Sequence, residues 1–355
     1  MKRLTIIMIL VCFLCTPVHA EGVRVGTTYS DVQSRYLGLN EDVAYTDVLK
    51  SGFGILRLGA YWDEIEKEKG QFDFFRLDRQ IWQAEEACVP LVITVGMKAP
   101  RWPEYFIPAW VLEEAKPAFG ADLSKNEYLK KRTLIFLEKV VSRYRDEAII
   151  KYWQVENEPM SRMGAKKWFI GKEFLGQEVA LVRELDGGRR PIVMTTATYP
   201  NVFLRLLARL SVRHDPIKET LEMCDILGLN VYPMVGYKFW KFRMYFRTTR
   251  NDREKYLSRV ISFAKSMRKE TWIVELQAEP WEPGHLAYQE EEIPPTGWPA
   301  AAEESFAEAR KLGIETIFLW GAEYWLFREL RYQDTGWKDL LKELLRESQP
   351  AGKKE

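Results

Sequence analysis

The chain is poor in the residues that bind metal ions or build disulfide frameworks. Its 355 residues include 4 cysteines and 3 histidines, and none of them forms a group with the spacing of metal ligands. We therefore expect neither a metal nor another cofactor. Beyond residue 20 the cysteines are Cys88 and Cys224, which are too few for a disulfide scaffold. Both lie close to apolar runs, which favours buried thiols.

The chain also lacks a strong net charge. It has 52 basic and 51 acidic residues, which gives a formal net charge of +1 at pH 7. Residues 1–20 contain two of the basic residues, Lys2 and Arg3, and no acidic residue. Without them the charges still balance, so composition gives no reason to expect a nucleic acid or a membrane surface as a partner.

Residues 1–20 have the three parts of a secretory signal peptide. Lys2 and Arg3 are followed by the apolar run Leu4–Cys15, and Val18–Ala20 is a small-residue cleavage site before Glu21. The apolar run is shorter than the about 20 residues that span a membrane. We expect removal of residues 1–20, export to the periplasm, the cell envelope or the medium, and one domain over 21–350. The alternative is an uncleaved N-terminal anchor.

Short apolar runs alternate with amphipathic segments along the rest of the chain. Such runs, rich in β-branched residues, are typical of parallel strands covered on both faces. Eight strand–helix units predict an α/β fold, a single closed (β/α)₈ TIM barrel. An open doubly wound sheet is the alternative, but no glycine-rich phosphate loop follows the first run. The runs are Val23–Thr28, Ile55–Leu58, Leu91–Val95, Ile149–Val155, Ile192–Thr196, Ile226–Val231, Trp272–Val274 and Thr316–Trp320.

Three amphipathic segments carry helix boundary signals. Ser124 and Glu127 form a capping box before the stretch that ends at Tyr144. A second stretch runs from Asp252 to Arg268, and a third, Ala300–Leu312, is followed by Gly313 as a C-terminal cap.

Two glutamates close apolar runs. Glu158 lies between Asn157 and Pro159 at the end of the fourth run, and Glu275 directly follows the seventh. Strands of a parallel barrel end at the same mouth, so both carboxylates are expected there. Paired carboxylates are what hydrolysis of a glycosidic bond requires. A structural ion pair is the alternative at each position, and Glu279 rivals Glu275. We interpret Glu156 as the structural partner of a basic group.

Aromatic residues reinforce this interpretation. Sugars present apolar C–H faces that suit flat rings, and 13 tryptophans occur in the chain. Core packing is the better interpretation for most of them; Trp320 is favoured as a sugar platform because it ends the eighth run. The tryptophans near run ends are Trp62, Trp102, Trp281, Trp320 and Trp325.

Two long loops follow the sixth and seventh runs. Residues Gly236–Arg250 interleave aromatic and basic side chains without any acid. They predict either a wall of the substrate cleft that grips an anionic glycan, or a helix or loop that packs its aromatics inward with its charges solvated; the second is favoured. Residues Glu282–Trp298 have the length of a lid over the site.

The run ends resemble clan A of the glycoside hydrolases, which includes cellulases, β-mannanases, β-galactosidases and β-xylosidases. The resemblance rests on Asn157-Glu158-Pro159, Glu275, Arg57 in the second run, Asn230-Val231-Tyr232-Pro233 and Trp320, and it covers nearly the whole chain after residue 20. It implies a TIM barrel that hydrolyses a carbohydrate substrate with retention of configuration.

The resemblance also implies roles for single residues. Glu158 would be the acid/base and Glu275 the nucleophile, which Arg57 and Tyr232 would contact. Asn157 would hydrogen-bond the sugar 2-hydroxyl, Trp320 would floor the site, and Trp102 is a further candidate for substrate contact. The third run departs from the pattern: it leads into Met97–Glu104 without the histidine of many members. Lys98 and Glu104 are hypothesised as substrate ligands there, or else as solvated loop charges.

The sequence therefore predicts a secreted retaining β-glycosidase. A catalytically silent carbohydrate-binding barrel is the main alternative. A metal-free barrel lyase or isomerase would not need the acid pair, and an inverting hydrolase would hold its carboxyl groups farther apart.

Overall fold

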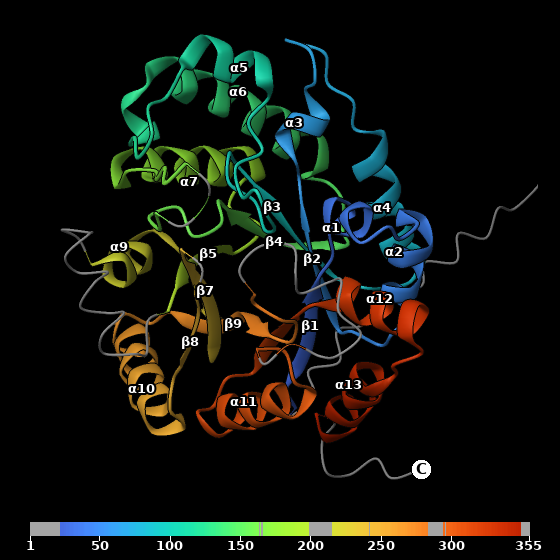
Figure 1. The fold of residues 1–355 in the computed structure, drawn as a ribbon. Helices are drawn as coiled ribbons and strands as arrows, with labels where there is room; N and C mark the ends of the chain where they lie inside the picture. The colour runs from blue at the N-terminus through green and yellow to red at the C-terminus, as the bar shows by residue number, and fades with distance from the viewer. Residues whose placement is uncertain are drawn as a thin grey trace, which may run out of the picture.

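A closed barrel of eight parallel strands forms the centre of the molecule (Figure 1). The computed structural model describes residues 22–348 except 163, 165, 199–214, 241, 283–293 and 295. The strands lie round the barrel in the order β1-β10-β9-β6-β5-β4-β3-β2. Their bounds are β1 Arg24–Thr28, β2 Ile55–Gly59, β3 Leu91–Val95, β4 Ile150–Val155, β5 Ile192–Ala197, β6 Ile226–Val231, β9 Glu270–Gln277 and β10 Thr316–Trp320.

The predicted (β/α)₈ fold and all eight predicted strands are thus confirmed. The strands are almost entirely buried because the barrel interior lies on one face and the helices on the other. Apolar side chains from six strands fill the interior, as in other small barrels: Ile55, Val92, Val193, Ile226, Trp272, Val274 and Phe318.

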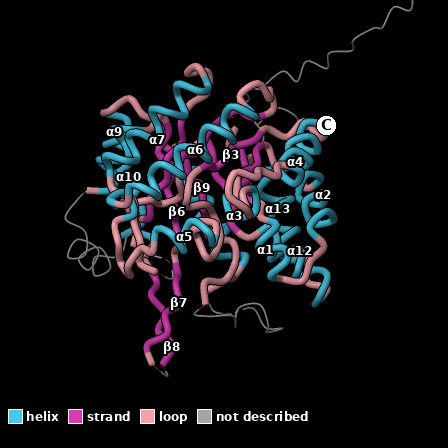
Figure 2. Tube along the Cα trace, turned by 90° about the horizontal axis from the view of Figure 1, so that it is seen from above, coloured by secondary structure: helices cyan, strands magenta, loops and turns pink. Residues whose placement is uncertain are grey.

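Helices surround the barrel in both views (Figures 1 and 2). Among the described residues, no helix combines the length and apolarity needed to cross a membrane. The helices are α1 Asp31–Tyr36, α2 Glu41–Lys50, α3 Trp62–Ile65, α4 Phe75–Glu86, α5 Ala109–Ala115, the 3₁₀ turn η1 Leu123–Lys125, α6 Glu127–Tyr144, α7 Lys172–Asp186, α9 Pro216–Met223, α10 Arg250–Ser266, α11 Pro299–Lys311, α12 Ala322–Tyr332 and α13 Gly336–Glu347.

Two of the three predicted helix boundaries need correction. The cap of α6 is Asn126, whose side chain accepts a hydrogen bond from the backbone N–H of Leu129 at 3.0 Å. Ser124 instead lies in η1, so the predicted capping box is wrong. Helix α10 begins two residues before Asp252, because Thr249 caps it. The end of α11 is confirmed: Gly313 follows its last turn with φ of 78°.

The segment after β6 forms a two-stranded antiparallel hairpin, β7 Met234–Phe239 and β8 Phe242–Arg247. It extends away from the barrel (Figure 2). Trp240 and Phe242 are 75% and 66% exposed, so the favoured prediction of inward-packed aromatics is wrong. The ribbon extends away from the barrel, so both of its faces are exposed along most of β8.

The two cysteines differ in their surroundings. Cys224 is buried, as predicted, but Cys88 is exposed in the turn between α4 and β3, and no disulfide joins them. Cys88 has a left-handed φ of 53° because the chain reverses there after the helix. The predicted signal peptide and most of the predicted lid lie outside the described residues.

Candidate active site

A β-bulge in β9 turns Glu275 into the barrel mouth. Trp272 and Val274 both belong to the apolar cluster that fills the barrel interior, so simple alternation would turn Glu275 away from it. The pairings with both neighbouring strands shift just after Ile273, which marks one extra residue in β9. Such bulges re-aim side chains.

Two donors hold the Glu275 carboxylate. Arg57 Nη2 donates to Oε1 at 2.8 Å, and Tyr232 Oη donates to Oε2 at 2.6 Å. Arg57 and Glu275 are both buried, and burial, followed by the nearby Glu275, raises the pKa of Tyr232 well above its usual value. The pair therefore fixes Glu275 as a charged, oriented carboxylate.

Glu158 lies in the turn beyond β4 with a left-handed φ of 45°. Asn230 Nδ2 donates to its Oε1 at 2.6 Å, and its own backbone N–H donates to Thr195 Oγ1 at 2.8 Å. Burial and, after it, the charge of Glu275 together raise the pKa of Glu158 to about 8, although the charge of Lys98 lowers it. Glu158 is therefore largely protonated at neutral pH.

Strand β6 connects the two carboxyl groups. Asn230, which contacts Glu158, is two residues before Tyr232, which contacts Glu275. Residues two apart share a face at a strand end, so both acids face the same mouth. Asn230 belongs to the segment Asn230–Pro233 on which the family resemblance rests, but no contact with Glu158 was predicted for it. Its spacing of two from Tyr232 was the available signal.

A buried hydrogen-bond network supports the pair from below. Arg57 Nε donates to Thr28 Oγ1 at 2.8 Å, and its Nη1 donates to Gln154 Oε1 at 3.2 Å. Gln154 Nε2 and Thr195 Oγ1 both donate to Asn157 Oδ1 at 3.2 Å. The network leaves the Asn157 amide nitrogen as its remaining donor. Thr28, Gln154 and Thr195 were missed, although polar residues inside apolar runs are a signal.

Glu156 is buried on the other side of the same turn. Its carboxylate accepts hydrogen bonds from the backbone N–H groups of Met97 and Lys98 at 2.7 and 2.6 Å. The carboxyl group of buried Glu178 of α7 lies near it, and burial raises the pKa of Glu156 to about 7. The predicted partner of Glu156 was a basic group; the main partners are instead backbone amides and a second carboxyl group, with the charge of Lys98 a lesser contribution.

The β3 loop, Gly96–Phe106, carries the two hypothesised ligands. Lys98 is fully buried, donates to the backbone carbonyl of Glu158 at 2.9 Å, and forms an ion pair with Glu104 at 3.0 Å. The alternative of solvated loop charges is therefore wrong. Lys98 thus links the Glu158 turn to Glu104 of the β3 loop.

The tryptophans predicted near strand ends lie in different parts of the structure. Trp320 lies at the mouth, 5.7 Å from the Arg57 guanidinium, and Trp281 packs edge-on against Tyr232 with ring centroids 4.7 Å apart. Trp62 and Trp325 belong to the core. Trp102 is 63% exposed at the tip of the β3 loop, and its contact with a substrate stays a prediction.

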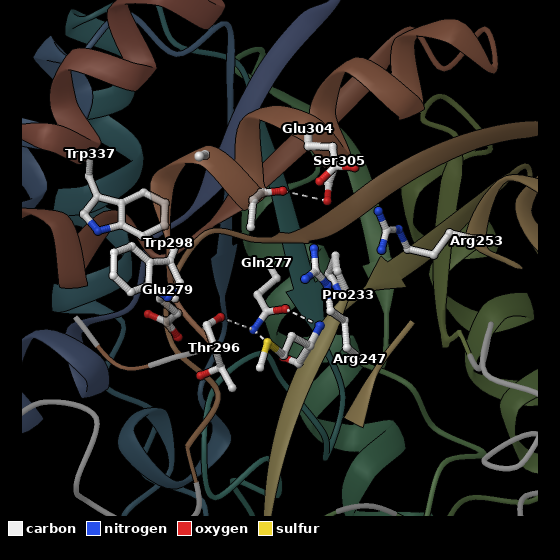
Figure 3. A pocket seen from close by; sticks show the side chains of 14 residues that line it. Pro233, Arg247, Arg253, Gln277, Glu279, Thr296, Trp298, Glu304, Ser305 and Trp337 are labelled. Carbon is white, nitrogen blue, oxygen red and sulfur yellow. Dashed lines mark hydrogen bonds between the residues drawn. The ribbon is translucent and has the colours of Figure 1, made fainter. Parts of the chain in front are cut away.

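Glu279, the alternative to Glu275 as the second catalytic acid, has other partners. It is buried and forms an ion pair with Arg101. It also lines a pocket of about 360 Å³ with Gln277, Thr296 and Trp298 (Figure 3). This pocket lies between the base of the hairpin, the end of β9 and the start of α11. Its lining includes neither Glu158 nor Glu275, so it is separate from the candidate site.

In the described part of the chain, no group of three or more histidine, cysteine or acidic side chains is arranged to hold a metal ion. The site offers two buried carboxyl groups with different hydrogen-bond partners, and the pKa of one of them, Glu158, is raised.

Comparison with known proteins shows similarity of fold and not of sequence. No family model matches the chain, and no curated protein matches its sequence. Among solved structures, xylanase 10B from Thermotoga maritima has a TM-score of 0.56 at 15% identity, covering 92% of this chain and 95% of the xylanase. GH5_18 from Streptomyces cattleya, in complex with GlcNAc, has a TM-score of 0.58 at 14% identity, covering 92% and 80%.

Larger enzymes match over part of their length. The β-galactosidase from Halorubrum lacusprofundi has a TM-score of 0.56 at 14% identity; the match covers 83% of this chain but only 52% of that enzyme. The chain thus spans about half the length of this relative. At these identities the likeness concerns the fold. The chain shares its TIM-barrel fold with these β-galactosidase, xylanase and GH5_18 structures.

Proposed function

We propose that the protein is a retaining β-glycosidase that uses Glu275 as nucleophile and Glu158 as acid/base. The observation that carries the proposal is the difference between the two carboxyl groups. Glu158 has a pKa raised to about 8, whereas Glu275 is bound by Arg57 and Tyr232 as a carboxylate. One protonated and one ionised carboxyl group at one mouth is the arrangement that double displacement needs.

The reaction has two steps. Glu275 attacks the anomeric carbon while the bond to the leaving oxygen breaks, and Glu158 gives that oxygen its proton. A covalent glycosyl-enzyme results. Glu158, now ionised, takes a proton from water; the resulting hydroxide attacks the anomeric carbon, and the bond to Glu275 breaks. Two displacements restore the original configuration.

The surrounding residues have positioning roles in this proposal. Asn157 offers its amide N–H groups to the sugar 2-hydroxyl, because Gln154 and Thr195 occupy its oxygen. Trp320 contributes an apolar wall beside the anomeric carbon. The chemistry of these side chains needs no cofactor.

Export belongs to the proposal as well. Residues 1–20 have the composition of a signal peptide, so we expect a mature protein that begins at Glu21 and acts on glycans outside the cytoplasm.

Nucleophile rescue tests the assignment. Wild type, Glu158→Ala and Glu275→Ala are assayed on aryl β-glycosides with and without azide. Azide should rescue Glu275→Ala and give a glycosyl azide of opposite anomeric configuration, and it should rescue Glu158→Ala with the substrate's configuration.

Exposed Glu85 of α4 supplies a matched control, and Glu85→Ala should keep full activity. Full activity in both site variants without azide would contradict the assignment. Glycan binding by an inactive wild type would favour the silent carbohydrate-binding barrel.

A further inference from the structure

The β3 loop is a narrow, doubled-back segment. Lys98 and Tyr105 form an antiparallel bridge. The backbone N–H of Ala99 donates to the carbonyl of Glu104 at 2.9 Å, and that of Phe106 donates to Met97 at 2.9 Å. Residues 100–103 therefore form the tip of a small hairpin.

The near side of this tip is tied to the neighbouring strand ends. Tyr61, just beyond β2, has its hydroxyl 3.2 Å from the carbonyl oxygen of Pro100, to which it can donate, and shares a hydrogen bond of 2.7 Å with Ser30 Oγ. Ser30 follows β1. The loop thus passes over the ends of β2 and β1 as it leaves β3.

The far side of the tip reaches across the barrel. Arg101 is only 5% exposed, although it lies at a loop tip, and it forms ion pairs with Glu279 and Glu323. Glu279 lies just beyond β9, which is four places from β3 in an eight-stranded ring. Strands four places apart are diametrically opposite, so the β3 loop spans the mouth.

Beneath the tip lies Trp320. The Arg101 guanidinium carbon is 4.0 Å from the centroid of its ring, and 7% of Trp320 is exposed. The backbone N–H of Ser30 donates to Glu323 at 2.6 Å, which fixes one carboxylate that holds Arg101. The half of the mouth over β10, β1 and β2 is therefore filled by tethered side chains.

The positions of Glu158 and Glu275 predict which end of the substrate lies over each half of the barrel mouth. The proton donor must face the leaving oxygen, so the leaving part of the substrate lies on the Glu158 side, over β4, β5 and β6. The sugar that becomes attached to Glu275 extends in the opposite direction. That direction leads toward Trp320, where the Arg101 guanidinium stacked on the ring stands in the way.

We infer that the Arg101 contact closes the site beyond a single sugar residue, so that the enzyme removes one terminal residue from the non-reducing end of its glycan. This inference rests on the proposed function and adds the substrate class to it: chain ends, with the remaining glycan leaving over the β6 side. Arg101 is the residue that sets this limit.

Paired fluorogenic substrates test the limit directly. Umbelliferyl β-monosides and β-1,4-linked biosides of galactose, glucose, mannose and xylose are compared by kcat/KM and by the first product. We expect the monoside of the preferred sugar to release umbelliferone, and its bioside to release a monosaccharide first. Release of a disaccharide as the first product would overturn the inference and leave the proposed function standing. No release from any substrate would overturn both.

Variants test whether Arg101 sets this limit. Arg101→Ala should yield a disaccharide from the bioside, with a rise of at least tenfold in bioside kcat/KM relative to the monoside. Arg259→Ala, at an exposed arginine of α10, should leave the ratio unchanged. If Arg101→Ala does not fold, the variant that also carries Glu279→Gln and Glu323→Gln removes the buried charges together. A folded variant that still releases only monosaccharide would contradict the role of Arg101.

Discussion

Glu158 and Glu275 have the same side chain but different surroundings. Glu275 accepts hydrogen bonds from a guanidinium group and a phenol hydroxyl. Glu158 accepts a side-chain hydrogen bond from a neutral amide, and its burial disfavours the charged form of its carboxyl group. The resemblance had implied the contacts of Arg57 and Tyr232 with Glu275, and the structure has both. The amide donor of Glu158 was not predicted, because Asn230 comes from β6, far away along the chain. Glu158 follows the end of β4 as predicted, whereas β9 continues past Glu275 to Gln277.

The pKa of Glu158 predicts the alkaline limb of the activity. A general acid works only while it is protonated, so kcat/KM should fall about tenfold per pH unit above the pKa of about 8. A pH profile on an aryl glycoside with a poor leaving group measures this. A 2,4-dinitrophenyl glycoside, whose leaving group needs no proton, is the control and should show a much weaker limb. Equal limbs for both substrates would count against Glu158 as the acid.

The same pKa predicts a stability gain in Glu158→Gln. The folded-state pKa lies above the unfolded one, so folding favours the protonated form, and wild-type stability is lost as pH rises from about 4.5 to about 8. The neutral variant escapes this loss. Its free energy of unfolding should exceed that of wild type by roughly 0.5–2 kcal/mol near pH 8, and the difference should vanish near pH 4. Urea titrations at both pH values measure it; a variant less stable at pH 8 would contradict the account.

At the scale of elements, the turn that carries Glu158 depends on Gly96. A Cβ there would lie 2.2 Å from Glu156 Oε1, and Gly96 has φ of 129°. Gly96→Ala should therefore displace the Glu156 carboxylate from the β3 loop and destabilise the fold by about 1–3 kcal/mol, with loss of activity. Gly176 is the matched control: it lies in α7 with open space around it, and Gly176→Ala should stabilise by about 0.5–1 kcal/mol. Thermal unfolding compares them; equal effects would refute the contact.

The hairpin of β7 and β8 should contribute little to stability. The side chains of Trp240 and Phe242 are largely exposed. Replacing both by serine should therefore change the free energy of unfolding by about 0.5 kcal/mol or less per site. Trp272→Ala, in the barrel interior, should cost about 3–5 kcal/mol. Denaturant unfolding of the two variants measures the contrast. A large loss from the hairpin variant would mean that its aromatics are packed after all.

The elements also show where sequence reasoning succeeds and fails. The eight barrel strands were predictable because burial on both faces leaves continuous apolar runs, such as Leu91–Val95. The hairpin was missed because its mixture of aromatic and basic residues is also found in exposed loops, although the alternation at Phe242-Arg243-Met244 is a strand signal. The bulge in β9 has no sequence signal in Trp272–Glu275, since it appears only in the pairing with two neighbouring strands.

At the scale of the whole molecule, barrel closure creates the site. It brings β4 and β9 to one mouth, although Glu158 and Glu275 are far apart in sequence. The parallel arrangement made that meeting predictable. The span of the β3 loop was not, because Arg101 and Trp102 are adjacent in sequence but one is buried and the other exposed. Removing Arg101 alone would leave two buried carboxylates, which costs about 3–5 kcal/mol.

Trapping of the covalent intermediate tests the central claim most directly. The protein is incubated with 2-deoxy-2-fluoro β-glycosides, which slow the release of the glycosyl-enzyme, and peptide mass spectrometry then locates the attached sugar. The account predicts one sugar on Glu275, and none in Glu275→Gln. A sugar attached to Glu279 or Glu158, or turnover with inverted configuration and no attached sugar, would contradict it.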